Sequence, residues 1–104
     1  MISIPVKGVY YHYKHDPNGE INNFAYEVLG VAQDTETGKF SVVYKPLYKI
    51  KSQEPIDFFV RPLKMFNEEI EVSSKLVRRF SLVTDLTTLR LIREAALIEL
   101  GDTK

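Results

Sequence analysis

Turn-forming residues divide the first two thirds of this chain into pieces of strand length. They are Pro5, Pro17, Asn18, Gly19, Gly30, Gly38, Pro46, Pro55 and Pro62. Proline cannot donate a backbone hydrogen bond and glycine adopts left-handed conformations, so both interrupt regular elements. The pieces between them are rich in aromatic and β-branched residues, which favour strands. The sequence therefore predicts several short strands joined by turns, as in a small β-barrel or sandwich.

The first predicted strand is "GVYYHYK", residues 8–14. Alternation in an extended chain places Tyr10 and His12 on one face and Tyr11 and Tyr13 on the other. We expect one face to lie in the core and the other to be partly exposed. The following "HDPNGE" is dense in turn formers and predicts a loop.

Four more strands are predicted downstream, in "FAYEVLGVAQD", "FSVVYKPLY", "IDFFVRP" and "KLVRRFSLV", with one helical turn at "LKMFNEEI". Gly30 predicts a bulge, and Gly38 predicts the tight turn of a hairpin. Pro46 is expected to mark the edge or the end of its strand, and Pro62 to stop the next one.

The hydrophobic period changes to that of a helix over residues 85–100. Thr84 or Asp85 is a suitable N-cap, and Gly101 stands where the helix would end. One broad apolar arc is expected to dock this helix on the barrel: Leu86, Leu89, Ile92, Ala96, Leu97 and Leu100. A second apolar stripe, made of Leu91, Ala95 and Ile98, remains as a candidate interface for a partner or for a homo-oligomer.

Composition limits the functional classes. The 104 residues are enough for a single domain, with the barrel over about residues 6–82. Fourteen basic and 14 acidic residues give zero formal net charge, which disfavours nucleic acid and anionic membranes as partners. The chain has no cysteine, and the N-terminal residues lack the apolar core of a signal peptide, so we expect a cytoplasmic protein.

Five ordered blocks resemble a bacterial family of small domains, the domain-of-unknown-function family number 1653. The blocks are "GVYYHYK", "YEVLGVA", "ETG", "VVY" with "LY", and "FVRPLKMF", spanning about residues 6–70. The resemblance implies a mainly β fold: a small, partly open SH3-like barrel of about five strands, here with an appended C-terminal α-helix. It implies no function. The chain departs from the family by insertions at about residues 15–25 and 49–56, and the helix lies outside the match.

The candidate ligand-binding residues are His12, Tyr13, Lys14, Glu27, Tyr44, Arg61 and Pro62. A histidine changes charge near neutral pH, and an arginine offers a planar fork to a carboxylate or phosphate. Each also has a structural interpretation. Arg61 would pair with Glu27 or Glu36 to fix barrel closure, and His12 would be a barrel histidine with satisfied hydrogen bonds.

The favoured function is a non-enzymatic binding or interaction domain for an unidentified protein, peptide or small molecule. The expected ligand groove runs between the loop of residues 16–22 and the corner at Arg61 and Pro62. Two alternatives remain: a nucleic-acid-binding barrel with stacking aromatic residues, and a small enzyme in which His12 works with Glu27 or Glu36 as an acid–base pair. No sequence motif indicates a metal, a cofactor or a catalytic centre.

Overall fold

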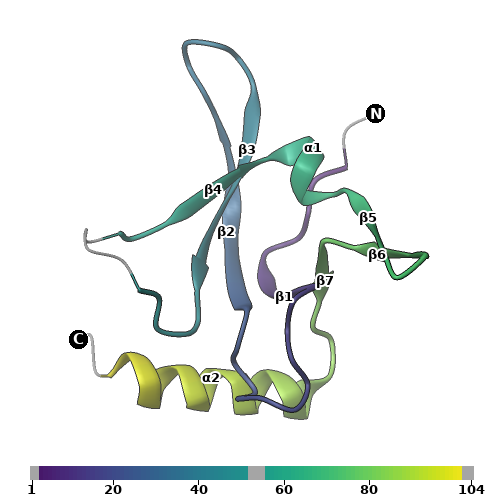
Figure 1. The fold of residues 1–104 in the computed structure, drawn as a ribbon. Coiled ribbons are helices and arrows are strands. Elements are labelled where there is room, and N and C mark those ends of the chain that lie inside the picture. Colours follow the sequence, from purple (N-terminus) through teal and green to yellow (C-terminus); the bar gives the residue numbers. More distant parts are fainter. Residues whose placement is uncertain (1–2, 52–55, 102–104) are drawn as a thin grey trace.

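The computed structural model describes residues 3–51 and 56–101. Within them, five antiparallel strands form one sheet in the order β4-β3-β2-β1-β7, and β5 and β6 form a separate hairpin (Figure 1). The strands are Gly8–His12 (β1), Ala25–Gln33 (β2), Phe40–Pro46 (β3), Phe59–Pro62 (β4), Glu69–Val72 (β5), Lys75–Arg78 (β6) and Phe80–Leu82 (β7). The helices are Leu63–Phe66 (α1) and Leu86–Leu100 (α2).

The bulge and the turn that were predicted in the long β2–β3 hairpin are confirmed. The register shifts between Val28 and Gly30, which is the bulge expected at this glycine. Gly38 has a φ of 77°, and its amide donates to the Asp34 carbonyl in the turn. β3 ends at Pro46 and β4 ends at Pro62, as predicted.

The sheet carries a core on each face. On one face lie α1 and the residues Tyr10, Tyr26, Val28, Val42, Tyr44, Leu63, Phe66 and Phe80. On the other face α2 covers a second cluster, made of Val9, Ala25, Leu47, Ile92 and Ala96. Neighbouring residues alternate between these clusters, Val9 and Tyr10 in β1 and Ala25 and Tyr26 in β2, so both faces of these strands are covered there.

The mainly β fold with a C-terminal helix is confirmed, but the SH3-like barrel is not. In the described part of the chain β4 and β7 form the two edges of the sheet, so the sheet is not closed. The predicted fifth strand is also divided. Its first half is β6, its second half is β7, and between them the Arg79 amide donates to the Glu68 carbonyl.

Helix α2 begins and ends as predicted but buries less than its expected arc. Asp85 caps the helix, since its carboxylate accepts a hydrogen bond of 2.8 Å from the Thr88 amide. Only Ile92 and Ala96 are buried, and the expected docking residues Leu86 and Leu97 are 79% and 67% exposed. Among residues 3–51 and 56–101, no helix is long and apolar enough to cross a membrane.

Candidate ligand-binding site

Three residues selected from the sequence meet around one ring, Phe80 of β7. The His12 ring lies edge-on to the Phe80 ring at 5.1 Å between centroids, and the Tyr44 ring does so at 5.5 Å. The Arg61 guanidinium lies over the same ring, 5.5 Å from its centroid. We call His12, Tyr44, Arg61 and Phe80 the Phe80 cluster. Strands β1, β3, β4 and β7 each contribute one residue to it.

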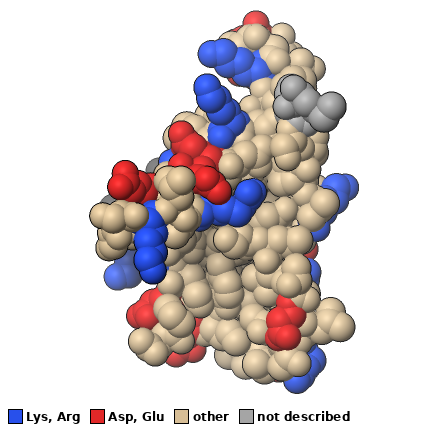
Figure 2. Space-filling model, turned by 90° about the vertical axis from the view of Figure 1, so that its right-hand side faces the viewer, with Lys and Arg blue, Asp and Glu red and all other residues tan. Residues whose placement is uncertain are grey.

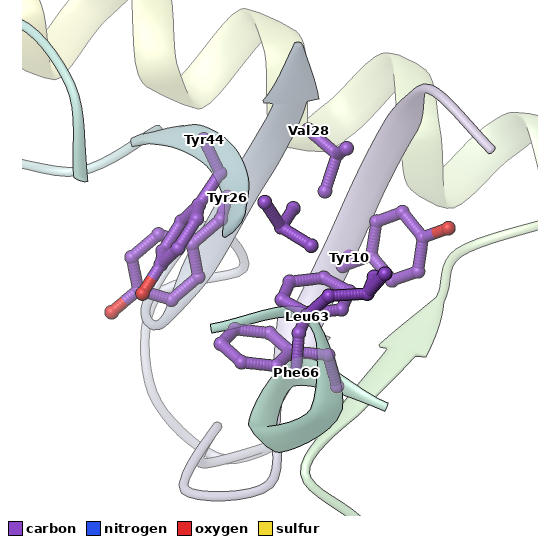
Figure 3. Packing of buried hydrophobic residues seen from close by; sticks show 8 residues of the cluster. Tyr10, Tyr26, Val28, Tyr44, Leu63 and Phe66 are labelled. Atoms are coloured by element: carbon purple, nitrogen blue, oxygen red, sulfur yellow. The ribbon is translucent and has the colours of Figure 1, made fainter. Parts of the chain in front are cut away.

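Cross-strand register and alternation build this cluster. Phe80 is opposite His12, and Phe59, two residues before Arg61, is opposite Tyr44. The Phe66 ring stacks on Phe80 at 4.2 Å between centroids, so helix α1 fixes the ring from the core. In Figure 3 the hydroxyl groups of Tyr26 and Tyr44 lie together at one side of the aromatic core, whereas that of Tyr10 points to the other side.

Arg61 is a half-buried cation that takes part in none of the ion pairs among the described residues. Its Nε donates to the Tyr44 hydroxyl at 3.4 Å, and its cationic plane is over an aromatic face. Arg79 differs, because its Nη2 is 2.9 Å from a Glu68 carboxylate oxygen. Arg61 therefore keeps donor capacity for an external anion.

His12 is held in its neutral form beside these cations. The pKa of His12 is lowered from 6.5 to about 4, mainly by burial and then by the positive charges of Arg61, Lys14 and Arg79 in that order. Its Nδ1 accepts a hydrogen bond of 3.2 Å from the Lys14 amide. A neutral ring adds no charge of its own, so His12 contributes shape and an aromatic wall near neutral pH.

Tyr13 and Lys14 form an exposed rim next to the cluster. The Tyr13 ring packs against His12 at 4.5 Å between centroids and remains 37% exposed. The Lys14 ammonium is 5.9 Å from the Tyr13 ring centroid. This rim offers an aromatic surface beside a positive charge.

Phe24, which the sequence did not single out, adds a strained residue to the same region. Its φ is 53°, a left-handed conformation that bulky side chains rarely adopt. Its carbonyl accepts from the His12 amide, and its ring lies 5.8 Å from that of His12 and 5.7 Å from that of Tyr48. Backbone strain of this kind is concentrated at functional sites. The sequence signal that could have placed Phe24 at this site is its alternation with Tyr26, which puts both side chains on one face of the strand.

The proposed partners for Arg61 and His12 are wrong. Glu27 faces the opposite side of the sheet, where its carboxylate lies 3.3 Å from Arg93 of α2. It neither closes the sheet with Arg61 nor forms an acid–base pair with His12, and it does not belong with the other candidate residues. Glu36 lies in the exposed β2–β3 turn and is in none of the ion pairs among the described residues.

The two ends of the expected groove line two separate hollows. Pro62 lies in a hollow of about 660 Å³ with Ser3, Lys39, Phe40, Leu63, Lys64 and Asn67. The loop of residues 16–22 borders another, of about 550 Å³, with α2. The two hollows share no lining residue, so the loop and Pro62 lie in different hollows. The other insertion, at residues 49–56, includes residues 52–55, which lie outside the described residues.

The predicted interface stripe borders that second hollow. Leu91 and Ile98 are 38% and 82% exposed, and both line it with Ala95 and Ile21. The buried Asn22 fixes the loop against α2 by donating to a Glu99 carboxylate oxygen at 2.7 Å and to the Leu47 carbonyl at 2.9 Å.

A metal site and a surface for a polyanion were also sought among the described residues. Across the described residues no three His, Cys, Asp or Glu side chains converge to hold a metal ion. Figure 2 shows the face with the β5–β6 hairpin, where basic and acidic side chains lie side by side. In that hairpin Arg78 is directly opposite Glu69. This mixture weakens any attraction to a polyanion.

Comparisons with known proteins place these features in a family context. The family model described as "Protein of unknown function (DUF1653)" matches residues 8–82, which include every strand and α1. A crystal structure of a DUF1653 protein from Bordetella bronchiseptica superposes with a TM-score of 0.55 at 29% sequence identity, covering 75% of this chain and 86% of that chain. No curated protein matches this chain.

Proposed function

We infer that the chain belongs to the DUF1653 family, whose model matches residues 8–82. We propose that this member is a non-enzymatic binding domain, which binds an anionic group of a protein or peptide at the Phe80 cluster. The observation that carries this proposal is Arg61, a half-buried guanidinium over Phe80 that is in no ion pair among the described residues. Burying part of a cation is costly without a compensating anion, so a ligand carboxylate would complete the site.

The surroundings of Arg61 favour a peptide over a free inorganic ion. Half-buried rings of Phe24, Tyr48 and Phe59 pack around the same aromatic core, and the exposed Tyr13 extends it to the surface. Aromatic side chains give large contact area at low entropic cost, as binding surfaces require. A peptide with an acidic side chain or a free C-terminus can use both the guanidinium and the rings.

The test is a peptide library screened against the wild-type protein, Arg61→Gln and His12→Asn. A parallel library lacks acidic side chains and has amidated C-termini. We expect the acidic library alone to yield ligands, with binding lost in Arg61→Gln. Arg90→Gln, which removes the same charge from an exposed helix pair, is the matched control. If the folded Arg61 and His12 variants bind like wild type, the assignment of this site is wrong.

A second candidate function is binding of single-stranded nucleic acid. The exposed Tyr13 ring beside Lys14 favours it, because bases stack on such rings while cations hold the backbone. Oligonucleotides are therefore included in the same screen. Binding of this kind must weaken steeply as salt rises, and affinity that is insensitive to salt would rule it out.

We also propose that α2 mediates contact with a second copy of the chain. The support is the exposed apolar surface of Leu91, Ile98 and Leu97, which lies outside the residues matched by the family model. Light scattering at high protein concentration tests this proposal, and a strictly monomeric protein would contradict it.

A further inference from the structure

The hollow beside α1 differs in chemistry from the Phe80 cluster. We call it the α1 hollow; its volume is about 660 Å³, in the range of small-molecule sites. Its apolar lining comes from Phe40, Pro62 and Leu63, and Phe40 is 40% exposed although its ring is large. An exposed phenyl ring in a concave site offers apolar contact to a ligand.

The charged lining of the α1 hollow is entirely basic. Lys39 enters from the β2–β3 hairpin and Lys64 from α1, and no aspartate or glutamate is among the described lining residues. Neither lysine is in an ion pair among the described residues. The nearby Asp34 carboxylate already accepts the backbone amides of Glu36 and Thr37 within its own turn.

The walls of the α1 hollow are fixed by the fold. Pro62 has a restricted backbone and ends β4 directly before α1, while Leu63 is buried in the aromatic core. Asn67, the C-cap of α1, donates to the Ser3 carbonyl at 2.7 Å and so holds the N-terminal segment at the rim. A preformed wall lowers the entropic cost of binding.

We propose that the α1 hollow binds a small amphiphilic anion, a molecule with an apolar body and one anionic group. The body contacts Phe40, Pro62 and Leu63, and the anionic group lies between the ammonium groups of Lys39 and Lys64. Pro62 and Arg61 point to opposite faces of β4, so this site is separate from the Phe80 cluster and does not depend on it.

The probes are decanoate and the uncharged decanol, titrated below their aggregation limits and followed by amide chemical shifts in two-dimensional NMR. We expect decanoate to shift the resonances of Lys39, Phe40 and Leu63–Phe66. The double substitution Lys39→Gln with Lys64→Gln should weaken decanoate about tenfold and leave decanol unchanged, as expected for losing two exposed ionic contacts. Phe40→Ser should weaken both probes.

Two controls separate this proposal from general charge effects and from the Phe80 cluster. Lys49→Gln with Lys51→Gln removes the same charge at exposed positions outside the hollow and should not affect decanoate. Arg61→Gln should also leave decanoate binding unchanged. Shifts that map to other elements, equal weakening by the control pair, or binding only to phosphatidylglycerol vesicles would each overturn the proposal.

Discussion

Acid should destabilise this protein through one residue, His12. Its ring is only 9% exposed and packs against Phe80, Phe24 and Tyr13, so protonation would place a charge inside the aromatic core. That new charge would also face Arg61, Lys14 and Arg79. The unfolded chain protonates this histidine freely, whereas the folded protein resists protonation.

The magnitude follows from the pKa of His12, which is lowered from 6.5 to about 4 in the folded protein. Above pH 6.5 both states are neutral, and the full stability is present. As the pH falls the unfolded chain takes up its proton first, so stability is lost between pH 6.5 and pH 4 and no further loss arises below that. Linkage gives a loss of about 2–3 kcal/mol at pH 4.5 relative to pH 7.5.

The assay is urea unfolding at pH 7.5 and 4.5 for the wild type and His12→Asn. Asparagine retains an acceptor for the Lys14 amide but cannot titrate. The variant should be less stable than wild type at pH 7.5, because it loses ring packing, yet its loss between the two pH values should be smaller than in wild type by about 2–3 kcal/mol. His15→Asn is the matched control and should keep the wild-type dependence, since His12 is still present.

An NMR titration of the His12 ring gives the direct check. We expect its resonances to move near pH 4, and Arg61→Gln should move that midpoint upward. A midpoint near 6.5, or equal pH dependence in wild type and His12→Asn, would refute the reasoning.

Substitutions at four further positions test other elements. Asn22→Ala should destabilise by about 1–3 kcal/mol in urea unfolding, because it leaves the Leu47 carbonyl without its buried donor. Gly38→Ala should cost about 1 kcal/mol in the same assay, since φ is 77° there. Asp85→Ala should fray the first turn of α2 and so reduce the helical circular dichroism of the protein, whereas Asp85→Ser, which retains a capping oxygen, should not. Ile98→Asp should abolish any concentration-dependent association in light scattering if α2 is the contact.

Much of the fold followed from local patterns in the sequence. Alternation and turn residues predicted the strands of the described residues except β5, which overlaps the segment expected to form one helical turn. Gly30, Gly38, Pro46 and Pro62 have the roles expected of them. Barrel closure was not predictable in this way, because whether two edge strands pair depends on distant parts of the chain. The docking face of α2 was overestimated because only Ile92 and Ala96 of the expected arc are buried in the second cluster, with Leu89 partly buried against it.

In the candidate site, too, local sequence patterns predicted some residues and long-range strand pairing determined others. His12, Tyr44 and Arg61 were selected for their chemistry, and the structure brings them together around Phe80. Phe80 was missed because its importance comes from the pairing of β7 with β1, which no local pattern reveals. Glu27 was wrongly grouped with them although its alternation with Tyr26 already placed it on the other face.

The pairing of β1 with β7 has a consequence for how the protein is made. Tyr10 is registered with Leu82, so the first strand finds one of its two neighbours almost at the other end of the chain. Phe80 and the α2 residue Ile92 are likewise needed to complete the two cores that β1 divides. During synthesis the β2–β3 hairpin can form early, but β1 must wait with one edge open until β7 has left the ribosome. Nascent chains that stall before residue 80 should therefore be the species that chaperones and proteases recognise.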